Sequence, residues 1–135
     1  RCYRGLFVLR LWFSAARKNG ARYCGLALNL KTPAEVLLPY VDQLDYVIFV
    51  SVEADYDGLP FRSGVLAKVR AAKAFLRPET EIWIDGGVNE SNLQEIVTAG
   101  VDGLVIGRSI FQAPSPVAAY HRIRRLVQEY ADKEV

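Results

Sequence analysis

The sequence contains no methionine, two cysteines and one histidine among its 135 residues. Two cysteines are too few for the disulfide framework of a small secreted domain. Cys24 lies in an apolar run, where we expect a reduced and buried thiol. These features favour a cytoplasmic protein. Because the chain starts with Arg1 and has no methionine, we expect it to be a piece of a longer protein.

Long apolar runs and a charge excess are missing as well. No run approaches the roughly 20 residues that a membrane span needs, and Arg10 interrupts the apolar segment LFVLRLWF near the start. The net charge is only +2, without a cluster of basic residues, which argues against nucleic-acid binding. The sequence therefore predicts one globular domain over residues 1–135, with neither a membrane nor a nucleic acid as partner.

Four short apolar segments have the length and composition of β-strands. The clearest is DYVIFVSV, whose β-branched and aromatic residues occupy both faces, as is typical of a parallel strand buried on both sides. The four predicted strands are residues 22–29, 45–52, 81–85 and 103–107.

Helical patterns alternate with these strands. The first covers residues 6–20, and a capping box at Thr32-Pro33-Ala34-Glu35 opens the second. The third, residues 65–76, has one apolar side and basic residues that we expect to form a solvated face. The last two are expected to be capped by Asn89 or Ser91 and by Ser115.

The alternation of strands and helices predicts an α/β fold with a parallel sheet, either a (β/α) barrel or a doubly wound sheet. In both folds the functional residues lie at the carboxyl ends of the strands. Two of these ends carry glycine-rich turns, Asp85-Gly86-Gly87 and Gly107-Arg108. The chemistry of the chain is therefore expected at these two turns.

Glycine lets the backbone approach a ligand closely, and backbone N–H groups at a helix start attract anions. Arg108 would add a charged, bidentate donor. The glycines would also suit two tight turns without any ligand. Two such turns on consecutive strands, one with an arginine, favour a phosphate site formed by Gly86, Gly87, Gly107 and Arg108.

Asp85 ends a predicted buried strand. A carboxylate in that place costs free energy unless it is paired, bound to a metal or catalytic. A helix cap or a salt bridge is the structural alternative. Its glycine neighbours favour a catalytic role for Asp85.

Residues 20–111 resemble the C-terminal part of the ribulose-phosphate 3-epimerase family. The similarity is carried by GLALNLKTPAEVLLPYVDQLDYVIFVSVE, EIWIDGGVN and AGVDGLVIGRSIF. The resemblance implies a (β/α)8 TIM-barrel type of fold, of which this chain supplies strands five to eight with their helices. It also implies an isomerase of pentose phosphate metabolism, which epimerises a ketopentose phosphate at C3 through a metal-stabilised enediolate.

The resemblance further implies roles for single residues. Asp85 would carry a proton and bind a divalent Zn, Fe or Mn ion, and Gly58 would join the phosphate site. The family's two histidine ligands and its second aspartate have no counterpart here. The only histidine, His121, lies in the last predicted helix, where a surface or packing role is expected.

Two alternatives stay open. Arg108 stands where the family usually has serine, and GRSIFQAPSPVAA resembles orotidine-phosphate decarboxylases and hexulose-phosphate synthases, which implies a lyase. The missing ligands instead favour a non-catalytic phosphate-binding or interaction half-barrel. Helices would cover only one face of a half-barrel sheet, so we expect self-association or contact with the remainder of a longer parent chain.

Overall fold

The computed structural model describes residues 17–52 and 59–133 of the chain. Its sheet has four parallel strands in the spatial order β1-β2-β3-β4, which is also their order in the chain. A doubly wound sheet reverses its strand order, whereas a barrel adds each strand beside the last. The observed order is therefore that of a barrel. The strands are β1 (Gly25–Leu28), β2 (Tyr46–Val50), β3 (Glu81–Asp85) and β4 (Gly103–Val105).

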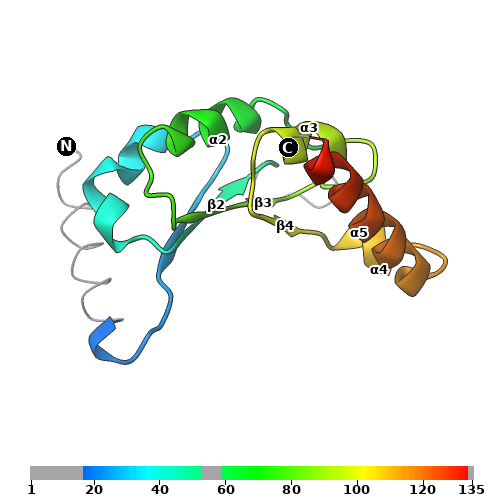
Figure 1. Cartoon of the computed structure of the whole chain (residues 1–135), viewed down its shortest axis with the longest axis horizontal. Helices are drawn as coiled ribbons and strands as arrows, with labels where there is room; N and C mark the ends of the chain where they lie inside the picture. The colour runs from blue at the N-terminus through cyan, green and yellow to red at the C-terminus, as the bar shows by residue number, and fades with distance from the viewer. Residues whose placement is uncertain (1–16, 53–58, 134–135) are drawn as a thin grey trace.

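All four predicted strands are confirmed, with β1, β2 and β4 shorter than predicted. The helices η1, α2, α3 and α5 lie along one side of the sheet (Figure 1), and no described helix crosses the other side. None of the described helices is long and apolar enough to span a membrane. The helices are η1 (Ala34–Gln43), α2 (Val65–Lys73), α3 (Leu93–Thr98), α4 (Arg108–Phe111) and α5 (Pro116–Asp132).

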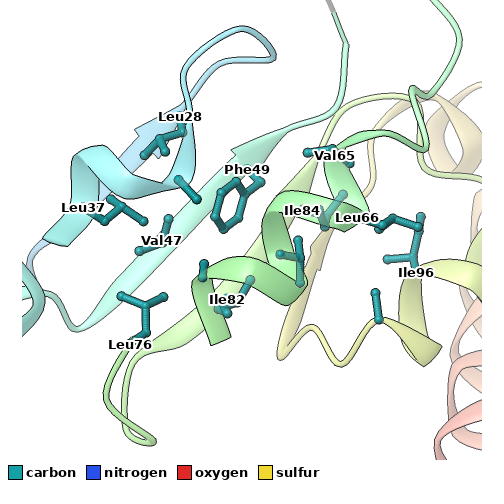
Figure 2. Close-up of a cluster of buried hydrophobic side chains, with 14 of the residues drawn as sticks. Leu28, Leu37, Val47, Phe49, Val65, Leu66, Leu76, Ile82, Ile84 and Ile96 are labelled. Atoms are coloured by element: carbon teal, nitrogen blue, oxygen red, sulfur yellow. The ribbon is translucent and has the colours of Figure 1, made fainter. Parts of the chain in front are cut away.

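The hydrophobic core lies between the sheet and these helices. Successive strand side chains point to opposite faces, so every second residue of β2 and β3 enters the core. Figure 2 shows Phe49 and Ile84 among side chains that come from α2 and its neighbours. Cys24 is buried and free at the edge of this core, as predicted. The strand residues in the core include Leu28, Val47, Phe49, Ile82 and Ile84.

The other face of the sheet carries larger side chains on its middle strands and glycines on its outer strands. The Tyr46 ring lies over Gly25 and the Trp83 ring lies over Gly103, because a Cβ atom added at either glycine would overlap with the facing ring. The Trp83 indole N–H donates a hydrogen bond to Glu81 (2.9 Å). This half-exposed face, called here the open face, is the one that would line the interior of a closed barrel.

The capping box predicted at Thr32 is wrong. The N-cap of η1 is Pro33, without a side-chain hydrogen bond, and the Thr32 hydroxyl lies 2.6 Å from the Asn29 side-chain oxygen. Pro39 lies within η1 and has no backbone N–H to donate. The segment accordingly forms a 3₁₀-helix rather than an α-helix.

One of the two later caps was predicted correctly. Ser115 accepts a hydrogen bond from the N–H of Ala118 (3.4 Å) at the start of α5. The N-cap of α3 is Asn92, not Asn89 or Ser91. The Asn89 side chain instead accepts hydrogen bonds from the N–H (3.0 Å) and the hydroxyl (2.6 Å) of Ser91. Asn89 therefore stabilises the turn before the helix.

The prediction that the basic residues of the 65–76 helix form a solvated face holds only in part. Arg70 is exposed, but the Lys68 ammonium donates hydrogen bonds to the carbonyls of Asn29 (3.1 Å), Leu30 (2.5 Å) and Thr32 (2.9 Å). Desolvation by burial lowers the pKa of Lys68. The lysine thus fastens α2 to the loop that follows β1.

Candidate functional site

A cavity of about 690 Å³ opens at the carboxyl ends of β3 and β4. It brings together Asp85, Gly86, Gly87, Gly107 and Arg108, which are the described residues that the sequence predicts for the site. The other lining residues are Leu59, Pro60, Val88, Asn89, Val105, Ser109 and Gln112.

Gly58, the remaining predicted phosphate-binding residue, lies outside the described residues, and its role stays a prediction. The next two residues, Leu59 and Pro60, do line the cavity. The segment after β2 therefore reaches the same site as the turns after β3 and β4.

The turn after β3 needs glycine at both positions. Gly86 has φ +111° and Gly87 has φ +65°, which L-residues with a side chain rarely adopt. A Cβ atom at Gly86 would lie 2.7 Å from Val52 Cγ2, and one at Gly87 would lie 2.7 Å from the backbone nitrogen of Phe61. Backbone geometry alone thus accounts for these two glycines, whether or not an anion binds there.

Ser51 fixes the backbone beside Asp85, a role that the sequence analysis missed. Its buried hydroxyl donates to the carbonyls of Asp85 (2.8 Å) and Gly86 (2.5 Å), and its N–H donates to the Asp85 carbonyl (2.8 Å). The sequence feature that could have indicated this role is the polar residue directly after the apolar run YVIFV. The carboxylate of Asp85 therefore starts from a well-anchored strand end.

Two further contacts organise the loops around the cavity, and sequence reasoning missed these as well. The side-chain amides of Asn89 and Asn92 donate to the Gly87 carbonyl at 2.9 and 3.0 Å. The Ser109 hydroxyl donates to the Val88 carbonyl at 2.6 Å. The loop after β4 is thus joined to the loop after β3, and the two turns form one wall.

The Asp85 side chain belongs to the open face, in the same alternation as Trp83. It forms no ion pair or hydrogen bond with any other side chain in residues 17–52 and 59–133. Neither a helix cap nor a salt bridge to a described residue explains its position. The catalytic role of Asp85 stays a prediction.

The turn after β4 offers donors to the cavity. Gly107 is the N-cap of α4, and a Cβ atom added there would meet nothing within 4 Å. The first N–H groups of a helix have no partner within it, and in α4 these belong to Arg108 and Ser109. Both residues line the cavity, and the guanidinium of Arg108 is exposed. Such a surface suits an anion.

The residues present do not fit a complete metal site. Among residues 17–52 and 59–133, no group of three or more His, Cys, Asp and Glu side chains is placed to hold a metal ion. Asp85 is the one acidic residue among those that line the cavity. His121, on α5, contacts the ring of Tyr120 edge-on with the centroids 5.5 Å apart. A divalent ion would need several ligands beside the single carboxylate.

Comparison with known families gives a consistent match. The model of the ribulose-phosphate 3 epimerase family matches residues 9–111. Ribulose-phosphate 3-epimerase 2 of Cupriavidus necator is 38% identical over 122 residues, which cover 85% of this chain and 50% of the relative. The Schizosaccharomyces pombe ribulose-phosphate 3-epimerase is 35% identical over 108 residues, covering 78% and 46%. The chain thus spans about half the length of these relatives.

Solved structures confirm the predicted TIM-barrel type of fold. The 3-hexulose-6-phosphate synthase of Salmonella typhimurium superposes with a TM-score of 0.67 at 13% identity, covering 92% of this chain and 57% of that one. Thiamine phosphate pyrophosphorylase of Pyrococcus furiosus gives a TM-score of 0.65 at 20% identity, covering 87% and 55%. At these identities the likeness concerns the fold alone.

Proposed function

The chain belongs to the ribulose-phosphate 3-epimerase family, and we propose that its cavity binds the phosphate group of a sugar phosphate next to the proton-carrying carboxylate of Asp85. One observation carries this proposal. A single cavity holds the carboxylate from the end of β3 and the cationic, donor-rich turn from the end of β4. The turn after β4 would hold the phosphate, and the turn after β3 would supply one of the two proton carriers that epimerisation needs.

The phosphate end of the proposed site is formed by Gly107 and Arg108, with Gly86 and Gly87 across the cavity. Arg108 offers charge and a bidentate fork, and the amides at the start of α4 offer further donors. A cavity of about 690 Å³ lies within the usual size range of small-ligand pockets. The names of the family members support ribulose phosphate as the substrate.

Asp85 would act on the carbon beside the substrate carbonyl. Removal of the C3 proton by a carboxylate leaves an enediolate, in which the electron pair moves onto the carbonyl oxygen at C2. Inversion at C3 requires a proton to return on the opposite face of that planar intermediate. One fixed carboxylate serves one face, so the described residues supply half of the acid–base chemistry.

The resemblance to the family also implies a divalent Zn, Fe or Mn ion with Asp85 as a ligand. The single carboxylate does not form that site by itself, and a bound ion would need ligands from outside the described residues. The proposed role of Asp85 in proton transfer does not depend on such an ion. We also propose that residues 1–135 form one partial barrel domain, completed by another copy or by the rest of a longer chain.

A non-catalytic phosphate-binding module is the second candidate, favoured by the presence of one acidic residue in the described cavity lining. It shares the phosphate site with the epimerase proposal, and it differs in having no proton transfer. The lyase alternative suggested by Arg108 also keeps the phosphate site. Phosphate binding and proton exchange must therefore be measured separately.

The first experiment measures the affinity of the chain for ribulose 5-phosphate by calorimetry. Arg108→Ala should weaken binding by about 1.5 to 3 kcal/mol, because it removes charged hydrogen bonds to the phosphate. Arg70→Ala, at an exposed site on α2, removes the same charge and should leave affinity unchanged. Equal affinities of wild type and Arg108→Ala would contradict the phosphate site.

The second experiment follows solvent deuterium entering C3 of ribulose 5-phosphate by NMR. Asp85→Asn should abolish exchange and preserve phosphate affinity, because it removes the base and keeps the shape of the side chain. Exchange that persists in Asp85→Asn would refute the proton-carrying role. A folded wild type that binds the sugar phosphate without any exchange would support the non-catalytic module.

A further inference from the structure

Exposed apolar side chains are concentrated at the two ends of the sheet. Among the described residues, the large apolar side chains that are exposed belong to the first strand–helix unit or to the last one, and the two middle units contribute none. Solvent contact over the middle helices is thus left to polar residues and alanines. The exposed side chains are Tyr23, Val36 and Leu38 at one end, and Val105, Phe111, Val117 and Tyr120 at the other.

The outer strands β1 and β4 each have a hydrogen-bonded neighbour on one side only within the described sheet. Within the described sheet, β1 pairs only with β2, and β4 pairs only with β3. An outer strand presents unpaired N–H and C=O groups that another strand can bind. The open face between them carries Tyr46, Ile48 and Trp83, which are only partly buried. Apolar surface and unpaired backbone therefore coincide at both ends and along the face that joins them.

We propose that a second copy of this chain covers the open face, with its β1 beside β4 and its β4 beside β1. Both new pairs are parallel when the two copies are related by a two-fold axis along the barrel. Four strands from each copy give eight, the number that closes a TIM barrel with a packed interior. A contact between unlike edges normally propagates into a ring or a filament, and here it closes after two copies.

The length of the chain agrees with this occupant. The chain spans about half the length of its epimerase relatives, and two four-stranded sheets together supply the eight strands of a TIM barrel. The small residues Gly25 and Gly103 on the outer strands leave room for the Tyr46 and Trp83 rings of their own copy. The middle of the open face is then free to meet the middle of the partner's open face.

This arrangement completes the site, an inference that rests on the proposed function. The two-fold axis places both copies of the carboxyl-end turns at the same end of the barrel. The Asp85 carboxylate would take the C3 proton as the C–H electron pair moves toward the C2 carbonyl oxygen. The partner's Asp85, initially protonated, would then protonate the opposite face of C3. One proton has left and one has entered, and exchange with water restores the two carboxyl groups.

Sedimentation velocity across a range of protein concentrations tests the interface directly. The wild-type chain should form a discrete species of twice the 15.1 kDa mass of one chain. Tyr23→Glu and Val117→Glu, at opposite ends of the sheet, should each weaken the dimer by at least about tenfold, because each buries an unpaired charge. Ala71→Glu, exposed on α2, introduces the same charge outside the interface and should leave the dimer intact. A monomeric wild type, or an open-ended series of larger oligomers, would overturn the proposal.

Binding of inorganic phosphate separates this inference from the proposed function. Val117→Glu should keep the phosphate affinity of the wild type, since each copy holds its own Gly107 and Arg108. It should retain deuterium exchange at C3 but lose inversion to the C3 epimer.

A dimer that does not bind phosphate would refute the phosphate site and leave the interface standing. A monomeric wild type that binds phosphate would refute the interface alone. Circular dichroism of both variants confirms folding, and Tyr23→Glu replaces Val117→Glu if the latter is unfolded.

Discussion

On the helix side of the sheet, Phe49, Ile82 and Ile84 are at most 2% exposed, whereas Ile48 and Trp83 on the open face remain partly exposed. These residues alternate along the same two strands, β2 and β3, and all have large hydrophobic side chains. Their difference in burial comes from the single layer of helices rather than from the strands themselves. An apolar strand therefore identifies two faces that can be buried, and the elements around it decide which face is covered.

The largest effect should come from matched truncations on the two faces. In the Val117→Glu background, where dimers are weakened, Ile84→Ala should lower the free energy of unfolding by about 2 to 5 kcal/mol. Ile48→Ala should cost less than half as much, because its side chain is already partly exposed. Urea denaturation measures both losses. Equal losses at the two positions would show that the open face is covered within a single chain.

A smaller effect on stability is expected at the two glycine turns, where Gly87 has close neighbours and Gly107 has none. Gly87→Ala should destabilise the fold by about 1 to 3 kcal/mol, because of its positive φ and the nearby Phe61 backbone. Gly107→Ala has no neighbour within 4 Å and should change stability by less than about 0.5 kcal/mol. Thermal unfolding measures the first effect. Phosphate titration of Gly107→Ala should show weaker binding, and unchanged affinity would place the anion elsewhere.

The smallest effect concerns Lys68 on the covered side, whose pKa is lowered by desolvation from its usual 10.5. Between the lowered folded-state pKa and 10.5, the unfolded chain binds more protons, so this group adds stability as pH rises. The contribution is complete above the unfolded pKa and is lost as pH falls through the folded one. Wild type should gain stability relative to Lys68→Met as the pH rises toward 10.5. A flat or falling difference in urea unfolding would contradict the desolvated state of Lys68.

The parts of the fold that follow from local chemistry were predicted from the sequence. The strand at 81–85 was located to the residue, because an apolar β-branched and aromatic run ends at two glycines. The cap at Ser115 was identified from a hydroxyl followed by proline and an apolar stripe. The gathering of Asp85 and Arg108 in one cavity followed from the rule that parallel strands bring their carboxyl ends together.

One error was local. The Thr32 hydroxyl bonds to Asn29, and Pro39 favours a 3₁₀-helix, so the capping box has no α-helix to begin. The other errors arose where distant segments determine the contacts. Lys68 meets carbonyls more than thirty residues away in the chain, which no helical pattern reveals. Ser51, directly after β2, likewise reaches the carbonyl of Asp85 on the neighbouring strand β3, 34 residues away in the chain. Such partners become visible only once the sheet register is known.

The agreement between the order of the strands in the chain and in the sheet has a consequence for how the protein folds. Each strand pairs with the one synthesised just before it, so no strand has to enter between two that are already paired. Contacts of this kind join segments close in sequence, which lowers the entropy lost on closing each loop. A chain emerging from the ribosome can therefore add one strand–helix unit at a time to a growing edge.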